Sequence, residues 1–374
     1  MLKNIIILNT AYLKFSNSKI FYINKKDDIY DIILFNKDGN IIFEKSFDHN
    51  NGIIYSFNEY IFLINKDNDC FQFDTINHLL EKIIDSKNLK FIHSNFNFFI
   101  YSDKYSFEKS NQIESPAVKY IYELDKLIWI YEGFGTINVF SKNYALCFTE
   151  SDPIFDNRSM NSFFLLDLNN KTELWYFNLE NHIDKLISQS PFNHPHKVGK
   201  PLGIYQDQLW FEMDNYGLMC LNKNTGEFMH YFRDCPENDK RYGGMPRGNY
   251  PVIPYTDQAV LLEDEGKIVC LAYWYYWELD LNTMQLDFHY LRDYFQEVGC
   301  YTFGARFKPL IIEGNLIYIV STQTKRFAAF NRNTLKYDWI EQLPDDAGQP
   351  KSIEKHEDRI YIETFGRKLL VYEV

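Results

Sequence analysis

A short unit of two strands joined by a polar turn recurs along the chain, and this repetition limits the possible folds more than any other feature. Each copy is an apolar run that ends in an acidic residue or asparagine, followed by a polar turn and a second run with aromatic residues. Repeats spaced by roughly 40 to 50 residues are typical of propellers and related arrays of small sheets. The six copies are IILFNKDGNIIFEKSF (32–47), CFQFDTINHLLEKI (70–83), FFLLDLNNKTELWYFNL (163–179), LMCLNKNTGEFMHYF (218–232), YWELDLNTMQLDFHYL (276–291) and FAAFNRNTLKYDWIEQL (327–343).

Two further short strands precede most copies of the unit. They are clearest in PLGIYQDQLWFEMDNYGLMCL, where Gln206 and Asp207 mark a turn, and in PLIIEGNLIYIVSTQTKRFAAF, where Glu313, Gly314 and Asn315 mark another. Each unit is therefore predicted to hold four antiparallel strands. One four-stranded sheet cannot bury both of its faces, whereas sheets stacked around an axis cover one another.

The ends of the chain fit a closed ring of such sheets. We therefore expect an all-β fold, a single β-propeller domain that spans residues 1–374. The last blade, 352–374, supplies only three strands, and the strand at residues 3–9 belongs to no complete unit. Pairing of these two segments would close the ring and cover its open edge. Residues 88–178 hold more strands than one blade needs, so the ring has seven or eight four-stranded blades. The strand count slightly favours eight, whereas the general expectation for propellers is seven.

One copy of the unit also matches a known repeat in its letters. LNKNTGEFMHYF resembles the repeat of propellers related to quinoprotein dehydrogenases (the PQQ-like family), which runs hydrophobic, Asp, two variable residues, Thr-Gly-Glu and then Trp. Asn222 replaces the Asp. The full matches are Thr225, Gly226 and Glu227. Aromatic residues near the Trp position are Tyr231 here and Trp175 and Trp339 in other copies. The resemblance implies the propeller fold.

The same resemblance raises the question of a bound quinone. Dehydrogenases of this family are exported, bind calcium through carboxylates near the axis and often carry an adjacent cysteine pair against the cofactor. None of these marks is recognisable in the sequence. We interpret Thr-Gly-Glu as turn chemistry, because Gly226 can adopt a positive φ without a steric penalty. No cofactor is expected.

Charge and composition narrow the possible partners. The net charge is -12 and the pI is near 5.3, so an extended phosphate backbone would be repelled and nucleic acid is not an expected partner. A basic protein is a more natural partner. Hydrophobic residues make up 45% of the chain and aromatic residues 18%, which is too apolar for disorder and favours strands.

The cysteines and the N-terminal segment favour a cytoplasmic protein. The six cysteines lie far apart without a CxxC pair, so neither a zinc site nor a redox motif is expected, and most are predicted to be buried thiols. The segment MLKNIIILNTAYLKF has only a short apolar stretch, too brief for a signal peptide or a membrane span. We therefore expect a soluble protein that does not contact membranes.

Three segments invite a chemical interpretation, and each has a simpler one. His194 and His196 could both face one metal ion, but no third ligand is recognisable, so a solvated loop is preferred. The segment YGGMPRGNYP (242–251) has three glycines, with Arg241 before it and Arg247 within it, but it lacks the Gly-Lys-Ser/Thr ending of a phosphate loop, so a flexible interaction loop is preferred. The rings of YWYYWELD (273–280) could form a binding platform, but strand alternation directs about half of them between blades. No nucleophile, acid-base pair or metal motif is recognisable.

Long connections provide the strongest functional signal. With strands A to D ordered from axis to rim, the B to C turns and the links between blades emerge on one face. The long segments of that face are 151–161, 187–200, 233–250, 292–308 and 344–352. Long loops on a rigid scaffold commonly bind partners, and Tyr and Arg are frequent interface anchors. The predicted protein-binding residues are His194, His196, Arg241, Tyr242, Arg247, Tyr250, Tyr294, Tyr301, Arg306 and Phe307.

These observations favour a non-catalytic protein-interaction propeller. A sharper version is an immunity-type protein that binds and neutralises a basic toxin domain through the long loops. The alternative is a carbohydrate-active hydrolase or lyase with an axial active site, which would need converging Asp, Glu or His side chains in a deep pocket. A scaffold subunit of a larger assembly is a third possibility. The sequence leaves the partner and the oligomeric state open.

Overall fold

The computed structural model describes most of the chain, with gaps at several connections. The described ranges are 2–7, 11–16, 19–26, 29–36, 40–48, 53–57, 60–64, 67–74, 76–84, 89–95, 98–103, 117–124, 126–133, 137–148, 162–182, 198–213, 217–232, 253–301 and 310–374.

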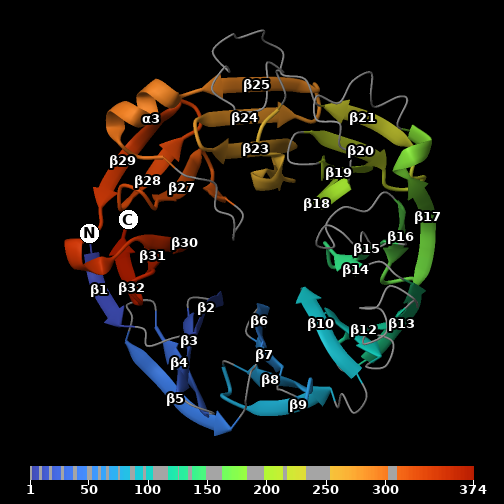
Figure 1. Cartoon of the computed structure of the whole chain (residues 1–374), viewed down its shortest axis with the longest axis horizontal. Helices are drawn as coiled ribbons and strands as arrows, with labels where there is room; N and C mark the ends of the chain where they lie inside the picture. Colours follow the sequence, from blue (N-terminus) through green and yellow to red (C-terminus); the bar gives the residue numbers. More distant parts are fainter. Residues whose placement is uncertain are drawn as a thin grey trace.

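The described strands form eight four-stranded antiparallel sheets, arranged as blades around a central axis (Figure 1). The first strand of each blade lies nearest the axis and the last lies at the rim. The protein is therefore an all-β propeller, as the repeats predict, and the strand order resolves the choice between seven and eight blades in favour of eight.

The bounds of the strands follow the repeats closely. Blades 1 to 3 are built from β2 Ala11–Ser16, β3 Lys19–Lys26, β4 Ile29–Phe35 and β5 Ile41–Asp48; β6 Ile53–Phe57, β7 Tyr60–Ile64, β8 Cys70–Asp74 and β9 Leu80–Ile84; and β10 Leu89–Asn95, β11 Phe98–Asp103, β12 Ala117–Glu123 and β13 Lys126–Gly133. Blades 4 to 6 are built from β14 Ile137–Val139, β15 Tyr144–Phe148, β16 Ser162–Asp167 and β17 Thr172–Asn178; β18 Val198–Tyr205, β19 Gln208–Met213, β20 Leu218–Asn222 and β21 Phe228–Phe232; and β22 Val260–Leu262, β23 Lys267–Ala272, β24 Tyr275–Asp280 and β25 Gln285–Tyr290.

Blade 8 combines the two ends of the chain. Its outer strand is β1, which pairs antiparallel with β32, the last strand of the sequence. Blades 7 and 8 are built from β26 Ile311–Glu313, β27 Leu316–Ser321, β28 Arg326–Asn331 and β29 Lys336–Gln342; and β30 Pro350–His356, β31 Arg359–Thr364, β32 Lys368–Glu373 and β1 Leu2–Ile7. The described helices are the 3-10 turns η1 Leu179–His182, η3 Thr256–Gln258 and η4 Asp345–Ala347 and the α-helix α3 Arg292–Val298.

The core consists of apolar layers between neighbouring blades. Phe163 of blade 4 and Phe211 of blade 5 are both fully buried, and their ring centroids lie 5.3 Å apart across the seam between the two blades. In blade 6, Tyr276 and Trp277 are adjacent in sequence and both buried, because alternation directs them to opposite seams. Aromatic residues therefore fill the space between blades.

The constant shape of the repeated turn has a local cause. The acidic residue or asparagine that ends the third strand accepts hydrogen bonds from the backbone N–H groups two and three positions later. In blade 5, Asn222 Oδ1 accepts from Asn224 and Thr225 at 2.8 and 3.1 Å. The same pair of bonds is made by Asp74, Asp167, Asp280 and Asn331. The fifth residue of each turn has positive φ: His78, Lys171, Gly226, Met284 and Leu335.

Gly226 of the Thr-Gly-Glu copy is required by packing as well as by its backbone angle. Its φ is 72°, and a Cβ atom there would lie 2.6 Å from the ring of Trp175 in the preceding blade. The Trp175 indole N–H donates to the carbonyl of Lys223 at 2.6 Å. This copy of the turn therefore docks blade 5 onto blade 4.

Candidate functional site

The strand order assigns the connections to two faces of the ring. Turns between first and second strands and between third and fourth strands lie on one face, which we call the turn face. Turns between second and third strands and links between blades lie on the other, the loop face. On blades 6 to 8 the described loop-face segments are 253–259, 273–274, 291–301, 322–325, 343–349 and 365–367.

Most of the predicted binding residues fall outside the part of the chain that the structure describes. They stay predictions: His194, His196, Arg241, Tyr242, Arg247, Tyr250, Arg306 and Phe307. The other two, Tyr294 and Tyr301, belong to the link between blades 6 and 7. The sequence presents this link as a loop, but its first part is the helix α3 (Figure 1).

Tyr294 attaches α3 to blade 7. Its hydroxyl oxygen accepts the backbone N–H of Tyr337 at 2.8 Å, and the two rings stack at 5.9 Å. The next residue, Phe295, is 1% exposed and packs edge-on against Phe330. Tyr294 therefore has a structural role in addition to any contact with a partner.

Tyr301 joins the same link to two loop-face turns. Its ring centroid lies 4.6 Å from that of Trp274, in the turn of blade 6, and its hydroxyl donates to the side chain of Gln323 in the turn of blade 7. The carbonyl of Trp274 also accepts the N–H of Leu291, at 2.7 Å. Tyr301 and Trp274 are half-buried, so each keeps an accessible edge on this face.

Hydrogen bonds to backbone carbonyls fix the links on both sides of blade 7. Arg326 donates to the carbonyl of Val298 at 2.5 Å, which fixes the end of α3 to blade 7. The N–H of Leu343 donates to the carbonyl of Lys325 at 2.9 Å, which fixes the link between blades 7 and 8. The loop-face segments of the three blades are therefore held in one connected framework.

Phe365 is the most exposed aromatic side chain of this framework, at 63%. Its backbone N–H donates to the carbonyl of Gln349 at 2.9 Å, and a Cβ on Gly366 would lie 2.6 Å from the carbonyl oxygen of Ala347. The turn is thus closely packed while the ring points into solvent. Loop length does not reveal Phe365. A phenylalanine in a three-residue connection between two strands has no blade to pack against, however, and this could have indicated it.

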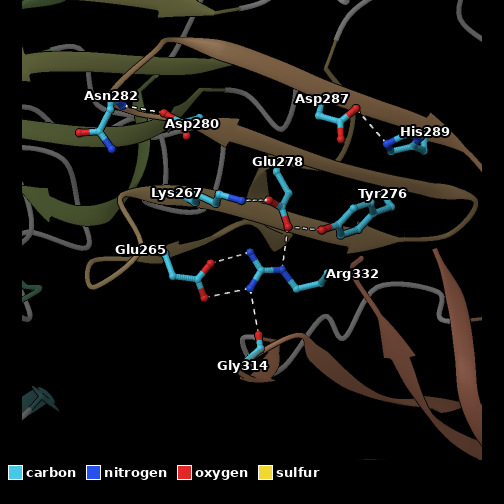
Figure 2. Close-up of polar contacts among 10 residues, drawn as sticks. All are labelled: Glu265, Lys267, Tyr276, Glu278, Asp280, Asn282, Asp287, His289, Gly314 and Arg332. Atoms are coloured by element: carbon cyan, nitrogen blue, oxygen red, sulfur yellow. Dashed lines mark hydrogen bonds and ion pairs between the residues drawn. The ribbon is translucent and has the colours of Figure 1, made fainter. Parts of the chain in front are cut away.

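A network of charged groups lies on the turn face, between blades 6 and 7 (Figure 2). The Arg332 side chain is only 4% exposed and donates to both oxygens of Glu265 at 2.9 and 2.8 Å. It also donates to Glu278 at 2.6 Å and to the carbonyl of Gly314 at 3.0 Å. Glu278 additionally accepts from Lys267 at 2.7 Å and from the Tyr276 hydroxyl.

The electrostatics of this network favour the charged forms. Burial alone would raise the pKa of Glu278, but hydrogen bonds from Arg332, Lys267 and Tyr276 outweigh it and lower that pKa below 4.5. Burial and the neighbouring Glu278 raise the pKa of the Tyr276 hydroxyl. Glu278 accepts three donors, from Arg332 and Tyr276 on Oε1 and from Lys267 on Oε2. The network therefore clamps blades 6 and 7 together.

The described cysteines are also unsuited to nucleophilic chemistry. All five are buried and unpaired. Burial raises the pKa of Cys300 to about 11 and that of Cys220 to about 12, so both stay protonated thiols at neutral pH. Within the described ranges, no group of three or more His, Cys, Asp or Glu side chains could hold a metal ion. No described helix is long and apolar enough to cross a membrane.

Comparison with known proteins shows the fold. No family model matches the chain, and no curated protein matches it. Among solved structures, BamB from Moraxella catarrhalis has a TM-score of 0.54 at 9% identity over 100% of this chain and 97% of that one. Sqt1 from Saccharomyces cerevisiae has a TM-score of 0.54 at 9% identity, covering 96% and 93%. The C-terminal WD40 domain of Sif2 has 0.52 at 10%, covering 96% and 92%.

These similarities define the class of the protein as a β-propeller. BamB and the WD40 domain are similar to the chain to nearly the same degree, so what they share with it is the architecture of the ring. At such identities, the likeness concerns the fold alone.

Proposed function

We propose that this chain is a non-catalytic protein-interaction propeller, and that the loop face of blades 6 to 8 is its binding surface. The observation that carries the proposal is Phe365, a largely exposed aromatic ring on a turn that backbone contacts hold in place. Large aromatic side chains dominate many interfaces, and a preorganised anchor loses little conformational entropy on binding.

Neighbouring residues support the same surface. Trp274 and Tyr301 present half-buried rings on the same face, in turns tied together by the contacts of Leu291 and Gln323. The sequence also attaches the long links that carry Arg241, Tyr242 and the other predicted anchors to this face. A rigid aromatic base beside long connections is a common arrangement for recognition.

The sharper form of the proposal is an immunity-type protein that binds and neutralises a toxin domain. The net charge of -12 supports a basic partner, because the field of an acidic protein accelerates its encounter with a basic one. The proposal includes a cytoplasmic location, where buried thiols such as Cys300 stay reduced. It also includes descent from the PQQ-like repeat without its cofactor, on the strength of Thr225, Gly226 and Glu227.

Affinity capture from the native host tests both forms. The bait is the purified chain. The test variant is Phe365→Ala on the loop face, and the matched control is Ile76→Ala, which removes an equally exposed apolar side chain on the turn face. We expect a basic protein to be retained by the wild type and by Ile76→Ala, and to be depleted on Phe365→Ala. Co-expression should protect cells from that protein if it is toxic. Retention of no protein, or equal retention by all three baits, would refute the proposed surface.

A further inference from the structure

One outer strand of the ring, β25, differs from the others in the regularity of its pairing with the neighbouring strand. In the described part of the chain, seven of the eight outer strands contain one extra residue that shifts their register against the neighbouring strand. The extra residues are Lys3 in β1, Ile42 in β5, Ile83 in β9, Ile128 in β13, Leu174 in β17, Met229 in β21 and Asp338 in β29. Only β25 pairs without a shift, from Tyr275 opposite Tyr290 to Asp280 opposite Gln285.

In blade 4 the bulge of the outer strand helps to pack that blade against the next one. Blade 6 is packed against blade 7 by other residues, so β25 does not need a bulge for this purpose. In blade 4, the residue after the bulge is Trp175, which reaches the next blade. The seam after blade 6 is filled in another way, by Phe295 of α3 and by the Arg332 network. The aromatic residue at the corresponding place of β25, Phe288, packs against the apolar layer between blades 5 and 6 instead.

The regular edge of β25 has a consequence for association. An outer strand presents unpaired backbone N–H and C=O groups, and bulges protect such edges by twisting them and interrupting their spacing. β25 is six residues long, lies at the rim (Figure 1) and has no described strand on its outer side. Among the described outer strands it is therefore the one best shaped to accept a further strand.

The side chains of β25 are complementary to themselves. Alternation places Asp287 and His289 on one face of the sheet and Leu286, Phe288 and Tyr290 on the other. Asp287 is 72% exposed, and within one chain its carboxylate already lies 2.9 Å from His289 Nε2. An antiparallel two-fold pairing centred on Phe288 sets Asp287 opposite His289 of the second copy, twice. On the other face it sets Phe288 opposite Phe288, and Leu286 opposite Tyr290.

Neighbouring registers lack this match. A two-fold centred on Asp287 would place two carboxylates directly opposite each other, which is destabilising in a sheet. A two-fold centred on His289 would set Asp287 opposite Leu291 of the second copy and give its carboxylate no polar partner across the strands. We propose that two copies of this chain pair antiparallel through β25, with the two-fold axis at Phe288, so that both copies of blade 6 join in one eight-stranded sheet.

Sedimentation velocity over about a hundredfold range of protein concentration tests the proposal, because a dimer forms by mass action. We expect the wild type to pass from monomer to dimer. Asp287→Lys should weaken the dimer about tenfold, because it removes both cross-strand pairs and adds repulsion. Glu173→Lys is the matched control, since it makes the same charge change on the exposed start of the bulged strand β17, and it should leave the dimer unchanged.

A double exchange and a cross-link make the test specific to the register. The double variant Asp287→His with His289→Asp keeps the two pairs and should retain the dimer. A cysteine at the axis, Phe288→Cys, should form a covalent dimer under mild oxidation, because opposite Cα atoms in an antiparallel pair lie within disulfide range. A chain that is monomeric throughout, or a dimer that Asp287→Lys and Glu173→Lys affect equally, would overturn the proposal.

Discussion

At the scale of single residues, a side-chain oxygen and a left-handed backbone position define each repeated turn. The oxygen of Asn331 accepts two backbone N–H groups, and Leu335 closes the turn with a positive φ. This explains why the letters vary between copies while the shape is constant, since either Asp or Asn can accept the bonds. The Thr-Gly-Glu sequence of one copy is therefore one of several sequences that can form this turn.

Asn331→Ala removes the two accepted bonds and the bonds that Asn331 Nδ2 donates to Asp338. We expect the free energy of unfolding to fall by about 1 to 2 kcal/mol, as for other local polar contacts. Asn333→Ala is the control, because in the described contacts Asn333 takes part through its backbone. Chemical denaturation measures both, and an equal loss in the two variants would contradict the role given to Asn331.

Substitution of two glycines with similar backbone angles distinguishes the cost of backbone strain from the cost of a steric clash. At Gly226, where φ is 72°, an added Cβ would clash with Trp175, whereas at Gly314, where φ is 55°, an added Cβ would have nothing within 4 Å. Gly314→Ala should therefore lose about 1 kcal/mol from the backbone alone. Gly226→Ala should lose at least about 2 kcal/mol, because the ring of Trp175 must also move. Equal losses by denaturation would show that the blade contact at Gly226 contributes nothing.

At the scale of elements, contacts between blades combine aromatic rings with ion pairs, among them the buried clamp of Arg332 between blades 6 and 7. Asn222 and its equivalents in the other turns are predictable from the sequence, since their side-chain oxygens accept from backbone N–H groups only two and three positions later. The clamp of Arg332 is not, because Glu265 and Glu278 lie 67 and 54 positions away. The helix α3 is hidden from sequence reasoning for a similar reason: it is only seven residues long, and its packing against Tyr337 decides its conformation.

Arg332→Met should destabilise the protein by about 3 kcal/mol, because it leaves Glu278 buried without its main partner. The control is Arg292→Met, which changes an exposed arginine at the start of α3. Thermal or chemical unfolding at neutral pH gives the comparison. A difference of less than about 0.5 kcal/mol between the two variants would contradict the clamp.

The clamp should also give the stability a defined pH dependence. The pKa of Glu278 is lower in the folded protein than its usual 4.5, so its ionised form stabilises the fold. This contribution is fully present above the unfolded pKa and is lost as the pH falls through the lower folded value. Between neutral pH and pH of about 3, the wild type should therefore lose more stability than Glu278→Gln. Parallel pH profiles would contradict this assignment.

At the scale of the whole molecule, the ring is a closed scaffold with two different faces. The sequence predicts the all-β propeller from its repeats, because each four-stranded unit must cover its neighbours. The blade count follows only from the pairing of strands between residues 88 and 178, where no repeat motif marks the boundaries. The exposure of Phe365 and the regular pairing of β25 are properties of the folded structure, so no sequence motif marks either of them.

The most direct test of the account is the affinity of the captured partner for three purified chains, measured by calorimetry. The wild type and Ile76→Ala should bind equally, and Phe365→Ala should bind at least about thirtyfold more weakly, the effect of losing an interface anchor worth about 2 kcal/mol. All three chains should show the same unfolding midpoint. A Phe365→Ala chain that is folded and binds within about twofold of the wild type would contradict the proposed binding face.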